Sequence, residues 1–176
     1  MLRPKIKKSR EKAWAILSNI GIAAEPVDVH RVADYLGLHI EYSRLDDEIS
    51  GMIYFRDGKT IVGINSGHHK NRQRFTIAHE CGHYVLHRET VLGSIHVDKR
   101  YPGLLRSDLS SKGIDSIEIE ANQFAAALLV PESFLIPHLE GSFPDIEDDE
   151  YVKLLARRFQ VSFQMMSNCL SNLRTH

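Results

Sequence analysis

The chain has 176 residues, of which 43% are hydrophobic and 26% charged. This composition can form one globular domain with a real core, which excludes a disordered or fibrous protein. The formal net charge of -1 excludes a global field that would attract nucleic acid or an anionic membrane. Cys81 and Cys169 have no metal-type spacing, and the chain has neither a signal-peptide-like segment nor an apolar run of membrane-spanning length. A soluble protein of the reducing cytoplasm is therefore expected.

Two helices are expected at the N-terminal end. Residues 5–20 begin with basic side chains and continue with apolar residues at helical spacing, which predicts an amphipathic helix ending at Gly21. The basic start is typical either of a solvated helix face or of an arm that contacts nucleic acid, and the first interpretation is favoured. Asp28 is a suitable N-cap for a second, short helix, which Gly37 stops.

The spacing of apolar residues then changes to a period of two. Residues 38–42, 51–55 and 60–64 are predicted strands, and Asp57-Gly58 is typical of the two-residue turn that joins the last two. We therefore expect a small antiparallel sheet of three strands packed on helices. An edge of this sheet could take up an extended peptide as another strand, or it could simply frame the fold.

The segment His79-Glu80-Cys81-Gly82-His83 carries the clearest chemical signal. Apolar residues around it predict a helix about three turns long, on which side chains four apart share one face. His79 and His83 can therefore direct both imidazoles at one cation with Glu80 beside it, whereas Cys81 points away. Two imidazoles and a third ligand leave a place for water, whose proton a neighbouring carboxylate can take. This H-E-x-x-H spacing indicates metal-assisted hydrolysis rather than a histidine pair that caps or packs.

Three other histidines are not expected to be ligands. His68 and His69 lie in a polar connection before the motif helix, and adjacent histidines in a loop are more often solvated. His87 shares the helical stripe of the motif, but a rise of about 1.5 Å per residue puts it about 12 Å from His79 along the axis. Donors to one zinc ion must converge within about 4 Å, so His87 should not complete the site.

Residues 88–115 show no sustained period and are expected to form a long loop, such as a lid or the wall of a cleft. His96, Asp98 and Tyr101 lie in this segment, and each could steady an oxyanion. No local pattern selects one of them.

A second long helix is predicted from Asp115 to Pro131, with a stripe of mostly small apolar residues that lets another helix approach closely. Glu118 and Asn122 stand one turn apart at the border of this stripe. Glu118 can complete the metal site, and Asn122 can hold a ligand histidine by its second ring nitrogen. An ordinary surface carboxylate is the alternative for Glu118. Glu120 is about 200° away around the helix and is expected to face outward.

The C-terminal residues predict a pair of helices. An acidic run at residues 145–150 suits the N-terminus of the first, and Ser162 is a suitable N-cap for the second. The pair resembles a helix-turn-helix, but its second helix has no lysine or arginine before Arg174. We therefore expect a packing element rather than a DNA reader.

Three segments together carry a family resemblance. They are Pro26-Val27-Asp28, then Phe75-Thr76-Ile77-Ala78-His79-Glu80-x-Gly82-His83 with Leu86-His87, and then Glu118-x-x-Ala121-Asn122-x-Phe124-Ala125-Ala126-x-Leu128-Leu129-x-Pro131. In this order they resemble the ImmA/IrrE family of metallopeptidases over about residues 25–165. The chain departs from that family at Gln160, where relatives tend to have glycine, and in the long segment 88–115.

The resemblance implies an α+β, zincin-like fold of the gluzincin type, with a small antiparallel sheet packed on helices and a helical C-terminal element like a helix-turn-helix. By matching positions it implies one Zn²⁺ per chain held by His79, His83 and Glu118, with Glu80 as the general base. We expect one metallopeptidase domain over residues 1–176. It comprises an N-terminal helix at 1–24, a catalytic core at 25–140 and a C-terminal helical element at 145–176.

The expected function is that of an intracellular zinc metalloendopeptidase. The resemblance implies that it cleaves a separate XRE-type helix-turn-helix repressor and so relieves repression of phage, mobile-element or stress-response genes. Direct binding to nucleic acid or to a membrane is not expected. The alternative is a zinc-binding sensor that binds a repressor or antitoxin without cleaving it, and such a protein would not need Glu80.

Overall fold

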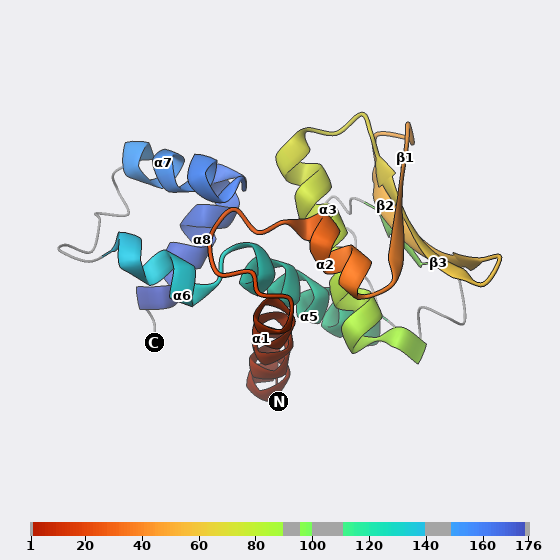
Figure 1. The fold of residues 1–176 in the computed structure, drawn as a ribbon, viewed down its shortest axis with the longest axis horizontal. Coiled ribbons are helices and arrows are strands. Elements are labelled where there is room, and N and C mark those ends of the chain that lie inside the picture. Colours follow the sequence, from red (N-terminus) through yellow and green to blue (C-terminus); the bar gives the residue numbers. More distant parts are fainter. Residues whose placement is uncertain (1, 90–95, 100–110, 140–148, 175–176) are drawn as a thin grey trace.

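The computed structural model describes residues 2–89, 96–99, 111–139 and 149–174. A mixed sheet and a set of helices form the molecule, with α3 and α5 between the sheet and the C-terminal helices (Figure 1). The elements are α1 (Leu2–Asn19), α2 (Val29–Tyr35), β1 (Leu38–Ser43), β2 (Ile49–Arg56), β3 (Lys59–Asn65), α3 (Lys70–Leu86), β4 (His96–Lys99), α5 (Ser111–Leu129), α6 (Glu132–Leu135), a 3-10 turn (Ile136–His138), α7 (Asp149–Phe159) and α8 (Phe163–Arg174). The expected α+β class, with a small sheet packed on helices, is confirmed.

Local signals in the sequence fix several element ends. The Asp28 carboxylate accepts hydrogen bonds from the backbone N–H groups of His30 and Arg31, and so caps α2. Gly37 follows α2 with a φ of 72°, a conformation that favours glycine. Asp57 and Gly58 both have positive φ, at 53° and 76°, as a tight turn between β2 and β3 requires.

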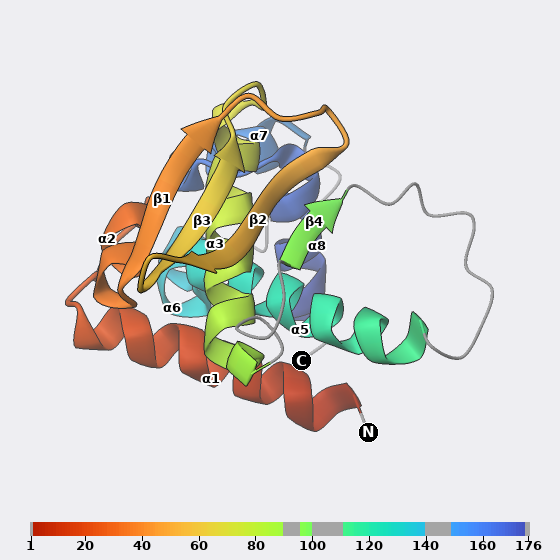
Figure 2. The ribbon, with the colours of Figure 1, turned by 90° about the vertical axis from the view of Figure 1, so that its right-hand side faces the viewer.

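The sheet has the strand order β1-β3-β2-β4 (Figure 2). The hairpin of β2 and β3 is antiparallel, as expected, but β1 pairs with β3 in parallel, from Leu38 beside Thr60 to Ser43 beside Asn65. The prediction of an entirely antiparallel sheet of three strands is therefore wrong at this pair. The reason is that β3 inserts between β1 and β2, although those two are consecutive in the chain.

The segment predicted as a long loop also contains regular structure. Residues 96–99 form β4, which pairs antiparallel with β2, and α5 begins at Ser111 within the same segment. Of the residues considered for an oxyanion, His96 and Asp98 lie on β4, and Tyr101 lies outside the described residues.

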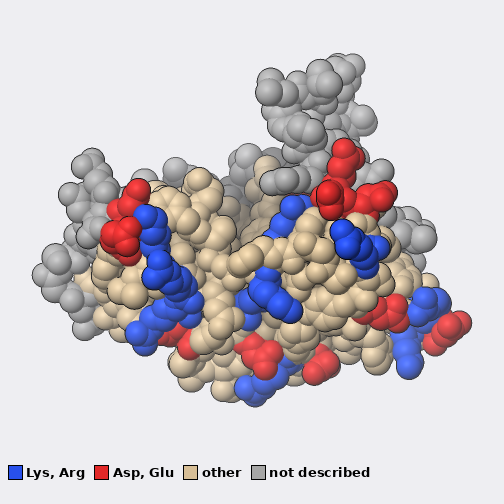
Figure 3. Space-filling view, turned by 90° about the horizontal axis from the view of Figure 1, so that it is seen from above, with Lys and Arg blue, Asp and Glu red and all other residues tan. Residues whose placement is uncertain are grey.

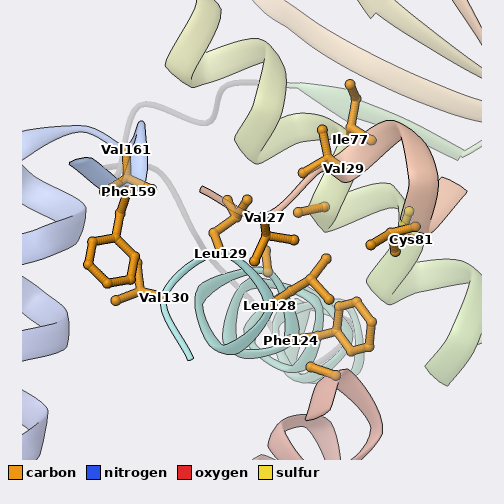
Figure 4. Close-up of a cluster of buried hydrophobic side chains, with 14 of the residues drawn as sticks. Val27, Val29, Ile77, Cys81, Phe124, Leu128, Leu129, Val130, Phe159 and Val161 are labelled. Atoms are coloured by element: carbon orange, nitrogen blue, oxygen red, sulfur yellow. The ribbon is translucent and has the colours of Figure 1, made fainter. Parts of the chain in front are cut away.

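The core lies where α3 crosses α5. Ile77 and Cys81 of α3 lie near Leu128 and Phe124 of α5, and Val29 of α2 closes this cluster (Figure 4). On its other side α5 packs against α1, whose Ala13, Ile16 and Leu17 belong to the same buried set. α5 is therefore held from two sides. Among the described helices, none is both long and apolar enough to cross a bilayer.

The helices α7 and α8 form the expected C-terminal helical pair. The side chain of Asn71 on α3 donates to the Val161 carbonyl at 2.8 Å, and Arg74 donates to the Gln160 carbonyl at 3.3 Å. Gln160 has a φ of 54°, so the position at which relatives tend to have glycine is a left-handed turn. α8 buries Met166 and Leu170 in the core, which gives it a packing role.

Candidate metal centre

The motif histidines lie one turn apart on α3 and face the same point. Their Nε2 atoms are 2.9 Å apart, and His79 and His83 are 3% and 0% exposed. The opposite face of α3, with Ile77 and Cys81, packs into the core, which fixes the rotation of the helix about its axis. The two imidazoles are therefore held in place by the burial of the residues on the opposite face of α3.

Glu118 of α5 reaches the same point from the facing helix. Its Oε2 lies 3.3 Å from His79 Nε2 and its Oε1 lies 3.3 Å from His83 Nε2. One donor atom from each of His79, His83 and Glu118 can be chosen so that all three lie within 4.8 Å of one another. The Glu118 side chain is 27% exposed, so this corner of the site is open to solvent.

The donor set fits a zinc-type cation. Ligands about 2.0–2.2 Å from a tetrahedral ion lie about 3.3–3.6 Å from one another, close to the separations of these three side chains. Two imidazole nitrogens and one carboxylate are a combination found at catalytic zinc sites, where the fourth position stays open. The residues present thus suit a metal that does chemistry rather than one that only supports the fold.

Asn122, one turn after Glu118, contacts the other nitrogen of His79. Its Oδ1 lies 3.0 Å from His79 Nδ1. Since an amide oxygen can only accept, this contact favours a proton on Nδ1 and leaves the Nε2 lone pair directed at the cation site. The structure thus places the Asn122 amide against His79.

Glu80 and Cys81 follow His79 on α3 and are both fully buried. Burial raises the pKa of the Cys81 thiol, with the nearby Glu80 carboxylate adding to the shift. Cys81 therefore stays a neutral core residue. Glu80 is held against the protein interior beside His79.

The sequence matches a family of known peptidases. The model of peptidase M78, the IrrE N-terminal-like domain, aligns with residues 33–171. This chain belongs to the peptidase M78 family. The family consists of metallopeptidases, and the buried pair of histidines with a facing glutamate agrees with that assignment.

Two individual proteins resemble this M78 family member. An uncharacterized immunity region protein 2 of Bacillus phage phi105 is 28% identical over 103 residues, which is 58% of each chain. The solved structure of a Mycobacterium tuberculosis transcriptional regulator superposes with a TM-score of 0.60 at 18% identity, covering 91% of this chain and 45% of the regulator. At that identity the second likeness concerns the fold alone.

Gly82 of the M78 motif has a structural role that the sequence analysis missed. A Cβ atom at this position would lie 3.1 Å from Phe124 Cδ1 and 3.2 Å from both Cα and the carbonyl oxygen of Ala121. Gly82 therefore allows α5 to approach α3 closely enough for Glu118 to meet the histidines. A glycine inside a helix, opposite a predicted stripe of small residues, was the available signal.

Glu120 does not face outward, and that expectation is wrong. Its side chain is 12% exposed, with Oε2 3.9 Å from His87 Nε2 and Oε1 accepting a hydrogen bond from Ser116. His87, just after α3, covers the side of α5 that carries Glu120. The spacing of apolar residues along α5 alone predicts that this side faces solvent. His87 and Glu120 thus form a second, largely enclosed pair beside the candidate metal centre, with the His83 and His87 ring centroids 5.7 Å apart.

The remaining histidines of the motif region lie elsewhere. The His69 ring accepts a hydrogen bond from the backbone N–H of Asn71 and caps α3. The His68 ring lies beside Asn65 and the Asp47 carbonyl. Neither joins the group of three donors.

Proposed function

We propose that this chain is a zinc-dependent metalloendopeptidase that cleaves a separate XRE-type repressor inside the cell. In this proposal His79, His83 and Glu118 hold one Zn²⁺ per chain, Glu80 is the general base and Asn122 orients His79. The observation that carries the proposal is the convergence of the three donor atoms beside a buried glutamate. The metallopeptidase family supports the type of reaction.

A repressor as substrate is supported by the phage relative. That protein is named for an immunity region. Cleavage of a repressor would release phage, mobile-element or stress-response genes. The sequence resemblance to ImmA/IrrE proteins points to the same class of substrate.

Each residue would have a distinct task in hydrolysis. A zinc ion held here would lower the pKa of a water molecule and polarise the scissile carbonyl. The Glu80 carboxylate would accept the proton of the attacking water and pass it to the leaving amine. Asn122 would keep His79 in the tautomer that offers Nε2.

The test compares wild type with Glu80→Gln. Both proteins, loaded with zinc, are incubated with an XRE-type repressor from the same genome, and fragments are measured by mass spectrometry. We expect wild type to cut the repressor, whereas Glu80→Gln should keep the fold and about one zinc per chain but lose cleavage, because an amide cannot accept the proton. Glu89→Gln, at an exposed position, is the matched control and should cleave like wild type.

Two outcomes would contradict the proposal. Cleavage by Glu80→Gln at the wild-type rate would exclude the peptidase mechanism. Zinc loading together with repressor binding, but no cleavage by wild type, would favour the non-cleaving sensor.

A further inference from the structure

A large cavity adjoins the candidate metal centre. It has a volume of about 1000 Å³ and lies between the N-terminal part of α3, the middle of α5 and the pair α7–α8. Two of its lining residues, Phe75 and Asn122, also contact His79. The ring centroids of Phe75 and His79 are 6.1 Å apart, and the Asn122 side chain forms a hydrogen bond with His79. A ligand in this cavity would therefore lie beside the candidate centre.

The charges that line the cavity have one sign. Arg72, Lys153 and Arg157 line it, and none of the described lining residues is Asp or Glu. Lys and Arg side chains form a band over α7 at the left of Figure 3. The chain as a whole has a net charge of -1, so this positive lining is a local feature.

The three cations differ in their surroundings. Arg72 donates a hydrogen bond to Ser50 Oγ at 2.7 Å, whereas Lys153 and Arg157 lie on the more exposed helix α7. Lys153 lies 2.8 Å from Glu150, but the two side chains are 44% and 79% exposed, and such surface pairs contribute little. Arg157 is exposed on the same helix one turn later. Both side chains can therefore turn to an acidic ligand at small cost.

The rest of the lining is apolar or carries amides. Phe75, Phe163, Met165 and Val161 supply apolar surface, and Gln164 and Asn168 supply hydrogen-bonding groups. A mixture of apolar, amide and cationic groups suits a polypeptide with apolar and acidic side chains better than a solvated small anion.

We propose that this cavity binds an acidic and apolar segment of the substrate protein, next to the bond that is cut, and that Lys153 and Arg157 determine this specificity. That the bound segment belongs to a substrate rests on the proposed function, but binding in the cavity does not require cleavage. DNA is disfavoured as the occupant, because α8 has no lysine or arginine before Arg174 and the cations lie in a cavity with aromatic walls.

The test measures binding and not turnover. Two labelled peptides of equal length, one alternating Glu with Leu and Phe and the other with Gln in place of each Glu, are titrated with zinc-loaded protein by fluorescence anisotropy at low salt. Mass spectrometry afterwards checks that the peptides are intact. Wild type should bind the Glu peptide about tenfold more tightly, as two partly exposed ion pairs allow.

Three variants test the assignment. The double variant Lys153→Gln, Arg157→Gln should bind both peptides equally. Arg44→Gln, Lys59→Gln removes the same charge from exposed positions that do not line the cavity, and it should keep the preference. Arg157→Glu alone should weaken binding of the Glu peptide relative to wild type while leaving binding of the Gln peptide unchanged.

The outcomes separate this proposal from the proposed function. Equal binding of both peptides by wild type, or a preference retained by the first double variant, would overturn the cavity assignment even if the repressor is cleaved. Failure to cleave a repressor while the peptide preference holds would overturn only the peptidase proposal. A DNA duplex that displaces the Glu peptide, and loses its affinity in the same double variant, would assign the cavity to nucleic acid instead.

Discussion

At the scale of single residues, the candidate centre depends on which carboxylate of α5 meets the histidines. Glu118 lies 3.3 Å from both Nε2 atoms, whereas Glu120 lies beside His87. Both carboxylates are largely buried, so neither is an ordinary surface residue. Their roles differ because they contact different histidines of the same stripe.

Substitution of these two glutamates by glutamine separates their roles. Glu118→Gln should weaken zinc binding by several kcal/mol, because the neutral amide is a poor ligand. Glu120→Gln should keep zinc affinity but lower the free energy of unfolding by about 1 kcal/mol through its weakened contacts with His87 and Ser116. Zinc titration and thermal unfolding of both variants measure the two effects. If Glu120→Gln alone lost the metal, the third ligand would have to be reassigned.

At the scale of elements, the approach of α3 to α5 decides whether the ligands can meet. Gly82 lies against the backbone of Ala121, one turn or less from both Glu118 and Asn122. The Ala121 backbone atoms cannot rotate out of the way, as the terminal atoms of a flexible side chain can. Any added atom at position 82 must therefore shift one helix relative to the other.

Gly82→Ala should lower zinc affinity although alanine favours helix by about 1 kcal/mol over glycine. The added methyl group would meet Ala121 at 3.2 Å and push Glu118 away from the histidines. Cys81→Ala is the control, because it removes buried volume from the other face of α3 and should cost stability without changing zinc affinity. Equal zinc affinity of Gly82→Ala and wild type would show that the close approach is not required.

The turn between α7 and α8 offers a gain in stability. Gln160 has a φ of 54°, which lies in the left-handed region. This conformation has a higher free energy for a residue with a Cβ atom than for glycine. Gln160→Gly should therefore stabilise the protein by up to about 1 kcal/mol in urea unfolding. Gln164→Gly, in the first turn of α8, should instead destabilise it by up to about 1 kcal/mol. A loss of stability in Gln160→Gly would mean that its side chain makes a compensating contact.

At the scale of the whole molecule, one buried carboxylate ties three distant parts of the chain together. Glu25 precedes α2, and its Oε1 lies 2.8 Å from His138 Nε2 and 2.5 Å from Arg158 Nε on α7. Burial acts to raise the pKa of Glu25, but the hydrogen bonds from Arg158 and His138 outweigh it and hold the pKa below 4.5. The ionised form is thus the one that stabilises the fold.

The pH dependence of stability follows from that direction. Because the pKa of Glu25 is lower in the folded than in the unfolded state, its contribution is present above the ordinary value of 4.5 and is lost as the pH falls through the lowered value. When the pH falls through the lowered pKa of Glu25, the free energy of unfolding should therefore decrease less in Glu25→Gln than in wild type. Glu48→Gln, at an exposed position, should behave like wild type. Parallel acid-denaturation curves for Glu25→Gln and wild type would refute the role of this carboxylate.

Features that depend on interactions within a few residues could be predicted from the sequence, whereas features that depend on contacts between distant parts of the chain could not. The spacing of His79 and His83 and the positions of Asp28 and Asp57-Gly58 were predictable because helix and turn geometry act within a few residues. The parallel pairing of β1 with β3, and β4 in a segment without period, depend on contacts between distant parts of the chain. Glu120 was misplaced for the same reason, since a projection of α5 alone contains no His87.

Asn122 belongs to two sites at once, because its amide contacts His79 and also forms part of the cavity wall. An occupant that competes for this amide changes how firmly His79 is oriented toward the cation. Thermodynamic linkage requires such an effect to be reciprocal, so that metal loading and cavity occupancy alter each other's affinity by the same factor. Through this side chain, the metal-free and metal-loaded forms would differ in their affinity for the protein that fills the cavity.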